Sequence, residues 1–353
     1  MAIDGASSRW YGLAVALLVG GAAVSALPTS PVAPGLARQA TGSPAPSPEV
    51  PAPCAAPDGR RVAVASAEEL ASALEEARPG DAIILADGVY PGRFVIAASG
   101  TPEAPITLCG SRRAVLAGGS TDRGYGVHLR ADHWRLVGFT VTDSQKGIVA
   151  DGANHNVLRG LAVYNVGQEG IHFRAFSSYN LLEDSEVHNV GVREGHNGEG
   201  VYVGSAHSNW CEYTDCQPDR SDFNEIRNNT IGPNTTAESV DIKEGTTGGV
   251  VAENTFSGAG MSDADSWVDV KGNGYRIAAN VGLRAPTDGF QTHVESNGWG
   301  RDNVFRGNVA DVHGDGYGVR IDGGEADPRG NAVGCDNRVD NAAEGLANVE
   351  CTP

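Results

Sequence analysis

The sequence predicts an all-β solenoid, a stack of short parallel strands, with one short helix before it. Three observations lead to this fold class. The 353 residues contain 48 glycines and only 20% charged residues, which indicates many tight turns rather than a coiled coil or a charged disordered chain. A unit of alternating apolar residues recurs at intervals of 21 residues or more. Asparagine also recurs at a fixed place in several of these units.

The first 57 residues carry signals for export rather than for a core. Arg9 precedes an uncharged apolar run over residues 10–27, with Val24, Ser25 and Ala26 near its end, which is typical of a secretory signal peptide. We therefore expect a signal peptide at residues 1–26, a Pro/Ala/Ser-rich linker at residues 27–57 and the solenoid domain at residues 58–353. An uncleaved membrane anchor is the alternative. After cleavage we expect a secreted, extracellular protein that does not bind membranes.

Residues 66–77 predict the one helix. Ser66 and Glu69 occupy the positions of a capping box. The apolar residues that share one helical face are Leu70, Ala73, Leu74 and Ala77. After Pro79 and Gly80 no helical periodicity returns.

The rest of the chain is a repeat whose first strands can be aligned. The equivalent positions are Val127, Ile148, Ile171, Val201, Val240, Val268, Phe290 and Val319. Their variable spacing indicates a base coil with insertions, and stacking such coils buries an apolar face that no single coil could bury. Four asparagines each follow an apolar residue by three positions, and we expect them to hydrogen-bond in a stack: Asn229, Asn254, Asn280 and Asn308. The alternative is that they are ordinary turn residues of another β fold.

The six cysteines predict disulfides, because an exported chain leaves the reducing compartment. The pairings we favour are Cys54 with Cys109, Cys211 with Cys216, and Cys335 with Cys351. A zinc site is the alternative, although the spacings lack paired CxxC motifs.

The segment ARPGDAIILADGVY and the coils after it resemble the pectate-lyase-like superfamily, from Val62 to the C-terminus. The resemblance implies a single-stranded right-handed parallel β-helix whose apolar end is capped by the helix at residues 66–77. The superfamily includes lyases, hydrolases, epimerases and adhesins, so the fold alone does not select an activity.

The outward face of the first strands concentrates charged residues. Because side chains alternate along a strand, Asp241 and Lys243 should face outward where Val240 faces inward. Lys243 in VDIKEG and Lys271 in VDVKGN should then lie one coil apart, about 4.8 Å. The neighbouring outward positions suggest a strip that binds a ligand: His172, Arg174, Tyr202, Asp269, His293 and Arg320. A solvated charge ladder is the alternative.

Lysine is rare in this chain, since Lys146, Lys243 and Lys271 are the only lysines among 26 basic residues. Lysine, unlike arginine, can lose its proton when burial or a nearby positive charge lowers its pKa. Each of the two stacked lysines lowers the pKa of the other, while the adjacent aspartates act in the opposite direction. The pair therefore offers a candidate general base.

A third column, two residues ahead of the inward positions, contains Lys146, Glu169, Glu199 and Glu238. Neighbouring carboxylates repel unless a proton, a cation or turn geometry separates them. Ca²⁺ prefers several hard oxygen ligands. The sequence therefore predicts a calcium site, for which the candidate ligands are Glu199, Glu238, Asp241 and Asp269. The alternative is that irregular turns hold these side chains apart.

The largest insertion, residues 205–222, contains Trp210, Tyr213 and the pair Cys211 and Cys216. Loops on rigid scaffolds often carry function, and aromatic rings suit sugar rings. We expect Trp267 to add a further sugar-binding surface.

This constellation predicts a polysaccharide lyase that cleaves a uronic-acid polymer by β-elimination. The reaction needs a base for the C5 proton and a cation near the uronate carboxylate. Lys243 or Lys271 is the candidate base, Ca²⁺ or Arg320 the candidate neutralising cation, and His293 the candidate acid. The segment ESVDIKEGTTGGVVAENTF is similar to the catalytic-lysine strand of the alginate lyase and chondroitinase B family, in which a calcium-binding Glu precedes the Lys by five residues, as Glu238 precedes Lys243. The next coil departs from that family, because VKGNG has Lys271 where an RHG-like motif supplies a catalytic arginine.

Two other functions remain open. A glycoside hydrolase would use Asp241 and Asp269 as paired carboxylates, although an Asp-Asp dipeptide is absent there. A non-catalytic glycan-binding or cell-surface β-helix would use the same strip only to hold sugar. The expected partner in every case is an acidic polysaccharide, bound by a monomer. Nucleic acid is excluded as a partner, because a net charge of −18 opposes binding by phosphate neutralisation.

Overall fold

The computed structural model describes Cys54 and residues 59–353 apart from residue 297. The predicted signal peptide at residues 1–26 and, except for Cys54, the predicted linker at residues 27–57 lie outside the described residues. None of the helices in the described part of the chain has the length and apolarity needed to span a membrane.

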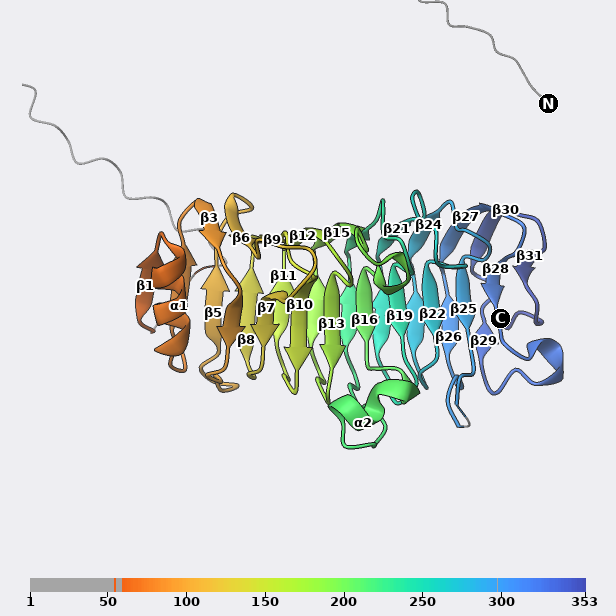
Figure 1. The fold of residues 1–353 in the computed structure, drawn as a ribbon. Coiled ribbons are helices and arrows are strands. Elements are labelled where there is room, and N and C mark those ends of the chain that lie inside the picture. The colour runs from red at the N-terminus through yellow and green to blue at the C-terminus, as the bar shows by residue number, and fades with distance from the viewer. Residues whose placement is uncertain (1–53, 55–58, 297) are drawn as a thin grey trace, which may run out of the picture. The chain divides into compact units, whose positions relative to one another are not determined.

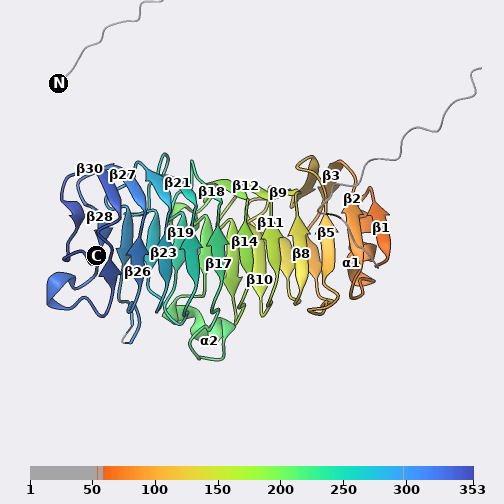
Figure 2. The same cartoon turned by 180° about the vertical axis from the view of Figure 1, so that it is seen from behind.

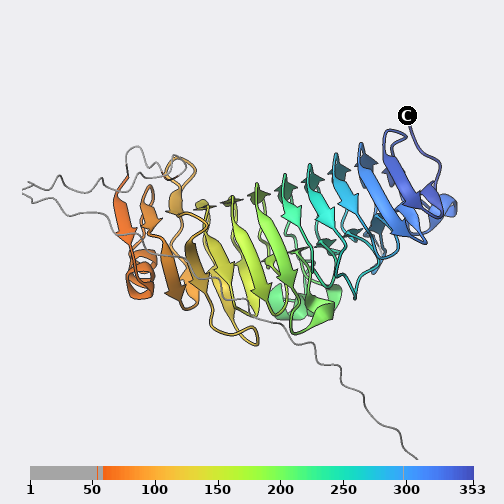
Figure 3. The ribbon, with the colours of Figure 1, turned by 90° about the horizontal axis from the view of Figure 1, so that it is seen from above.

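The described residues form an all-β, right-handed parallel solenoid, as predicted (Figure 1). Its strands belong to three sheets of 10, 11 and 10 strands, which we call sheet 1, sheet 2 and sheet 3 in the order in which each coil visits them. The colours in Figure 3 run in sequence order along the stack, so that each coil lies against the coils before and after it in the chain.

Sheet 1 bears the predicted site. Its strands are β4 (Phe94–Ile96), β7 (Tyr125–Leu129), β10 (Lys146–Asp151), β13 (Ile171–Arg174), β16 (Val201–Val203), β19 (Val240–Ile242), β22 (Val268–Val270), β25 (Phe290–Thr292), β28 (Tyr317–Arg320) and β31 (Gly345–Ala347).

Sheet 2 follows sheet 1 in each coil and is seen from behind in Figure 2. Its strands are β1 (Arg61–Val64), β2 (Ala82–Leu85), β5 (Ile106–Cys109), β8 (Trp134–Val137), β11 (Val157–Arg159), β14 (Leu181–Glu183), β17 (Glu225–Arg227), β20 (Val250–Ala252), β23 (Arg276–Ala278), β26 (Val304–Arg306) and β29 (Ala332–Val333).

Sheet 3 closes the coil. Its strands are β3 (Gly88–Pro91), β6 (Ala114–Ala117), β9 (Thr140–Thr142), β12 (Ala162–Val166), β15 (Glu186–Val190), β18 (Thr230–Ile231), β21 (Thr255–Ser257), β24 (Val281–Leu283), β27 (Val309–Gly314) and β30 (Arg338–Ala342).

The register of sheet 1 confirms the predicted alignment of the coils. Ile148 pairs with Val127 on one side and with Ile171 on the other, and the pairing continues through every predicted position to Val319. These residues are buried, and their apolar side chains form the core of the solenoid. The coils close tightly just before each strand. A Cβ added to Gly170, for example, would lie 2.6 Å from the carbonyl oxygen of Gly200.

The predicted asparagine stack is confirmed at the turn between sheets 2 and 3. Both the backbone N–H and the side-chain amide of Asn254 donate to Oδ1 of Asn280 at 3.0 Å. Asn229 makes the same pair of bonds to Asn254, and Asn280 makes it to Asn308. The side-chain oxygen of each buried asparagine thus accepts two hydrogen bonds from the asparagine one coil earlier, which fixes the stacking register.

The predicted helix is α1 (Ala67–Glu75), two residues shorter at its C-terminal end than the apolar pattern suggests. Ser66 caps its N-terminus by accepting from the Glu69 backbone N–H at 3.2 Å, and the Glu69 carboxylate accepts from Ala65 N–H at 2.8 Å. The helix buries Leu70 and Leu74 in the core of the first coils. Its role as a cap stays a prediction.

All three predicted disulfides are present. They join Cys54 to Cys109, Cys211 to Cys216, and Cys335 to Cys351. Cys54 is thereby tied to β5 of sheet 2. No free cysteine remains among the described residues.

Candidate active site

A continuous chain of opposite charges crosses the outward face of sheet 1. It consists of Lys243, Asp241, Lys271, Asp269 and His293, and we call it the ion-pair chain. Asp241 binds the Lys243 ammonium at 2.6 Å and the Lys271 ammonium at 3.0 Å. Lys271 also pairs with Asp269, whose other oxygen lies 2.8 Å from Nδ1 of His293. The structure therefore brings together two predicted ligands and three predicted catalytic residues.

The solenoid register produces this arrangement. Val240 pairs with Val268 and Asp241 with Asp269, so that β19 and β22 present the same outward positions one coil apart. Asp241 and Asp269 are 1% and 2% exposed. A buried carboxylate requires close positive partners, because desolvation disfavours its charge. The two lysines supply them.

The two aspartates prevail over lysine–lysine repulsion. Burial alone would lower the pKa of the Lys243 ammonium, but the charges of Asp241 and Asp269 raise it well above its usual value. The same carboxylates raise the pKa of Lys271 against its own burial. Both lysines are therefore protonated in the free protein. They differ in access, because the Lys243 side chain is 16% exposed and that of Lys271 only 7%.

Beside the ion-pair chain lies a cluster of carboxylates, formed by Glu199, Glu238 and Asp241. Each offers an oxygen, and these oxygens all lie within 4.8 Å of one another. Burial and the charge of nearby Glu169 raise the pKa of Glu199 well above its usual value. Burial and the charge of Asp241 raise the pKa of Glu238 to about 8. Glu199 and Glu238 therefore favour their protonated forms, since among the described residues they have no ion-pair partner such as the two lysines of Asp241.

The buried carboxylate oxygens of the cluster fit a calcium ion. Oε2 of Glu199 is buried and has no hydrogen-bond partner among the described residues. A buried oxygen without a donor is costly, and Ca²⁺ satisfies several carboxylate oxygens at once. Asp269, predicted as a fourth ligand, is not part of this cluster. Its oxygens pair with Lys271 and His293.

His172 and Tyr202 line the same face in the coils before Lys243. Nε2 of His172 lies 2.8 Å from the carbonyl oxygen of Gly204, and its ring meets that of Tyr202 edge to face at 4.4 Å. The Lys243 ammonium lies 5.2 Å from the centroid of the Tyr202 ring. Burial, together with the charge of Lys146, keeps the pKa of His172 well below its usual value, so its ring is neutral.

The prediction that Trp267 belongs to a sugar-binding surface is wrong. Its side chain has no exposed surface and lies in the core, edge to face with Phe290 at 5.7 Å. Gly282 and Gly289 leave the space that it fills, since a Cβ added at those positions would approach its ring to 2.3 and 3.0 Å. Trp267 is therefore a packing residue and cannot stack on a sugar.

Arg320 faces outward as predicted but lies apart from the lysines. It pairs with Gln291 of β25, which places it three coils beyond Lys243, about 14 Å away at the strand spacing. It makes no hydrogen bond to the described residues and is not part of the ion-pair chain.

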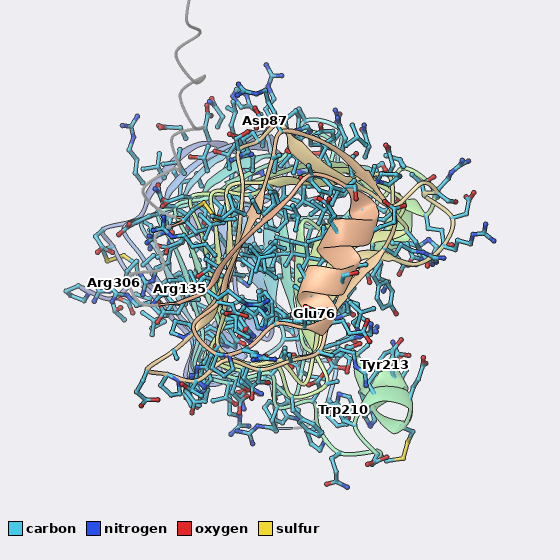
Figure 4. All side chains as sticks on the ribbon, turned by 90° about the vertical axis from the view of Figure 1, so that its left-hand side faces the viewer. Glu76, Asp87, Arg135, Trp210, Tyr213 and Arg306 are labelled. Carbon is cyan, nitrogen blue, oxygen red and sulfur yellow. A yellow bond between two sulfur atoms is a disulfide. The ribbon has the colours of Figure 1, made fainter. Side chains whose placement is uncertain are left out.

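The insertion at residues 205–222 packs against sheet 1 through α2 (Trp210–Tyr213). Trp210 is buried within the loop, where its Nε1 donates to the Ser205 carbonyl oxygen at 3.0 Å. The Tyr213 ring stacks over the Arg174 guanidinium, whose Cζ lies 4.1 Å from the centroid of that ring. Figure 4 shows both side chains on α2, beside the stacked coils. Of these two aromatic residues, only Tyr213 faces the predicted strip.

Sequence reasoning missed the groups that hold Arg174. Asp151 accepts from its Nε at 2.7 Å, and the Tyr125 hydroxyl lies 3.0 Å from its Nη2. Tyr125 pairs with Lys146 in the sheet. Extending the third column from Lys146 back by one coil would therefore have found Tyr125.

Comparisons with known proteins agree with this fold. Residues 53–220 match the family described as Pel9A-like, right handed beta helix region. A search among curated proteins gives no significant match. The crystal structure of alginate lyase from Paenibacillus sp. str. FPU-7 is 39% identical with a TM-score of 0.76, and the alignment covers 82% of this chain and 99% of that chain. Pectate lyase Pel9A is similar in fold, with 17% identity, a TM-score of 0.63 and coverage of 83% and 79%. The chain therefore belongs to the pectate-lyase-like superfamily of right-handed parallel β-helices, among its polysaccharide lyases.

Proposed function

We propose that this protein is a secreted lyase that cleaves a uronic-acid polymer by β-elimination, with Lys243 as the base. The observation that carries the proposal is the buried ion-pair chain on the outward face of sheet 1, which shares Asp241 with a cluster of three close carboxylates. The similarity to an alginate lyase makes alginate the first polymer to test.

The elimination removes the C5 proton of a uronate and breaks the bond to the oxygen at C4 of the same ring. Lys243 is the better candidate for the base, because it is the more exposed lysine and is held by one carboxylate. Lys271 is held between two carboxylates and is the more buried. We assign it the role of fixing Asp241 and Asp269. Lys243 must first lose a proton to solvent, which its partly exposed side chain can reach, and the charge of Asp241 opposes this loss.

His293 is the proposed acid for the leaving oxygen. Its hydrogen bond with Asp269 raises its pKa above the usual value, against burial, so the ring holds a proton more firmly at neutral pH. The bond uses Nδ1, which leaves Nε2 for the substrate. His293 lies two coils from Lys243, about 10 Å between backbones. Because both groups must act on one sugar unit, we expect the side chains of Lys243 and His293 to reach toward each other over β22.

Glu199, Glu238 and Asp241 are the residues that would hold Ca²⁺. When bound there, the ion would supply positive charge beside both Asp241 and the substrate carboxylate. His172 and Tyr202 would contact the sugar on the side of the earlier coils.

Secretion agrees with the covalent structure. Three disulfides form and persist in oxidising compartments, and the sequence of residues 1–26 is typical of a signal peptide. The partner is an acidic polysaccharide met outside the cell, which we expect the protein to bind as a monomer.

Incubating the purified chain with alginate, pectate and glycosaminoglycans, with and without a calcium chelator, tests the proposal. Absorbance of the unsaturated product on one polymer, reduced by the chelator, supports it. New reducing ends without that absorbance would instead indicate a hydrolase that uses Asp241 and Asp269. Binding without cleavage would indicate a glycan-binding protein.

A further inference from the structure

A cavity opens on sheet 1, on the side of the ion-pair chain where the earlier coils lie. Its volume is about 320 Å³. The polar side chains that define it include Tyr125, Lys146, Glu169, His172, Arg174 and Tyr213. The insertion at residues 205–222 contributes Ser205, Asn209 and Tyr213 to its lining, and the connection between β15 and β16 contributes Asn197. Residues of β10 and β13 and of these two loops therefore line the cavity together.

Arg174 is held rigidly at this cavity. Asp151 accepts from its Nε at 2.7 Å and from its Nη2 at 3.2 Å, and the Tyr125 hydroxyl lies 3.0 Å from the same Nη2. The Tyr213 ring covers the guanidinium at 4.1 Å. The other amino group, Nη1, makes no hydrogen bond to the described residues. A fixed guanidinium with a spare N–H donor is preorganised to bind an oxyanion.

Lys146 adds a second cation to the same cavity. Its ammonium pairs with Oε1 of Glu169 at 2.6 Å. An ammonium has three N–H donors, and the described residues accept only this one bond from it. Arg174 and Lys146 thus face the cavity with spare donors, in a protein whose net charge of −18 otherwise repels anions.

His172 supplies the complementary acceptor. Its Nε2 faces the Gly204 carbonyl oxygen, so this nitrogen carries the hydrogen of the neutral ring. Its Nδ1 is buried and has no hydrogen-bond partner among the described residues. The residue is 3% exposed and lines the cavity. A ligand with an oxyanion and a neighbouring hydroxyl group would satisfy both the donors and this acceptor.

We propose that this cavity binds the carboxylate of a uronate unit that flanks the unit cleaved at Lys243, with Arg174 and Lys146 as its ligands and His172 accepting from a sugar hydroxyl. Arg174 and Lys243 occupy the same outward column two coils apart, about 10 Å at the strand spacing. The two residues therefore contact different units of one chain. This inference rests on the proposed function, because it requires an acidic polysaccharide as the substrate.

Steady-state kinetics on alginate oligomers of increasing length test the inference. We compare the native chain with Arg174→Gln, Arg174→Lys and Lys146→Gln. For long oligomers, Arg174→Gln should raise KM about 10-fold to 100-fold, the loss expected for a charged hydrogen bond, with kcat changed less than about twofold. Arg174→Lys should restore part of the affinity. For oligomers too short to reach the cavity, all four proteins should have the same KM.

Because Arg174 is buried beside Asp151, each variant also needs a thermal unfolding curve. Lys146→Gln replaces a more accessible cation, so it keeps the test valid if Arg174→Gln unfolds. An equal KM increase at all lengths, or none in either variant, would overturn the inference. Such a result would leave the proposed function standing as long as unsaturated product still forms.

Calorimetric binding separates this inference from the proposed function. If the native chain cleaves nothing, binding of long alginate oligomers that weakens in Arg174→Gln still supports the cavity as a uronate site. Carboxyl-reduced oligomers distinguish recognition of the carboxylate from recognition of the sugar. They should bind at least 10-fold more weakly than native oligomers to the native chain, and the same reduction should weaken binding to Arg174→Gln by a clearly smaller factor. Equal binding of reduced and native oligomers to the native chain would overturn the inference.

Discussion

At the scale of single residues, the carboxylates of sheet 1 decide how the molecule responds to pH. The pKa values of Glu199 and Glu238 lie above the ordinary value of 4.5 in the folded chain, and that of Glu238 is raised to about 8. The folded chain therefore binds more protons than the unfolded chain between these two values. Stability consequently falls as pH rises through that window. His293, whose pKa is raised above 6.5, contributes in the same direction.

The fall of stability with rising pH leads to a prediction that also tests the calcium site. In chelator, the free energy of unfolding should fall by a few kcal/mol between pH 5 and about pH 8. Calcium should restore most of this loss at the higher pH and little at pH 5, where protons already occupy the cluster. Denaturant unfolding at the two pH values, with and without Ca²⁺, measures this. Glu238→Gln should flatten the profile, and a native stability that rises with pH would contradict the account.

Trp267 gives a second prediction at this scale. Trp267→Ala should lower the free energy of unfolding by about 3–5 kcal/mol, because it removes a fully buried indole from the core. Trp267→Phe should lower the free energy of unfolding by less than Trp267→Ala does. Equilibrium unfolding in denaturant measures both. A loss of polysaccharide affinity with unchanged stability would instead return Trp267 to the sugar-binding surface.

At the scale of elements, the asparagine stack sets how strongly successive coils are joined. Asn254→Ala should lower the free energy of unfolding by about 2–4 kcal/mol, because it leaves the buried amide donors of Asn229 without an acceptor. Thr230→Ala, at an exposed position of β18, is the control and should change stability by less than about 0.5 kcal/mol. Chemical denaturation compares the two. Equal effects would show that the stack does not join the coils.

The insertion at residues 205–222 gives the prediction for a single loop. Replacing Cys211 and Cys216 with serine should raise KM for long oligomers several-fold, because the loop that holds Tyr213 over Arg174 loses its covalent brace. The unfolding temperature should change little. The matched control replaces Cys335 and Cys351 near the C-terminus, which should lower stability without changing KM. An unchanged KM in the first variant would show that the loop orders itself without the disulfide.

At the scale of the whole molecule, the repeat made the fold and the columns predictable. Apolar residues that recur once in every coil, despite insertions between them, fix which positions face inward, so Val240 and Val268 locate Asp241 and Asp269 without any coordinates. Interactions that depend on side-chain reach were not predictable in this way. The contacts of Asp269 with Lys271 and His293 depend on side-chain distances at two neighbouring strands, β22 and β25. The burial of Trp267 depends on two glycines in later segments of the chain.

The central claim is that Lys243 acts as a base on the outward face of sheet 1. Lys243→Arg tests it most directly, because arginine keeps the positive charge beside Asp241 but does not give up its proton. We measure formation of unsaturated product from alginate and, in parallel, thermal unfolding. The account predicts a loss of at least about 100-fold in kcat at a native unfolding temperature, while Lys271→Arg keeps most of the activity. Near-native activity of Lys243→Arg would contradict the account.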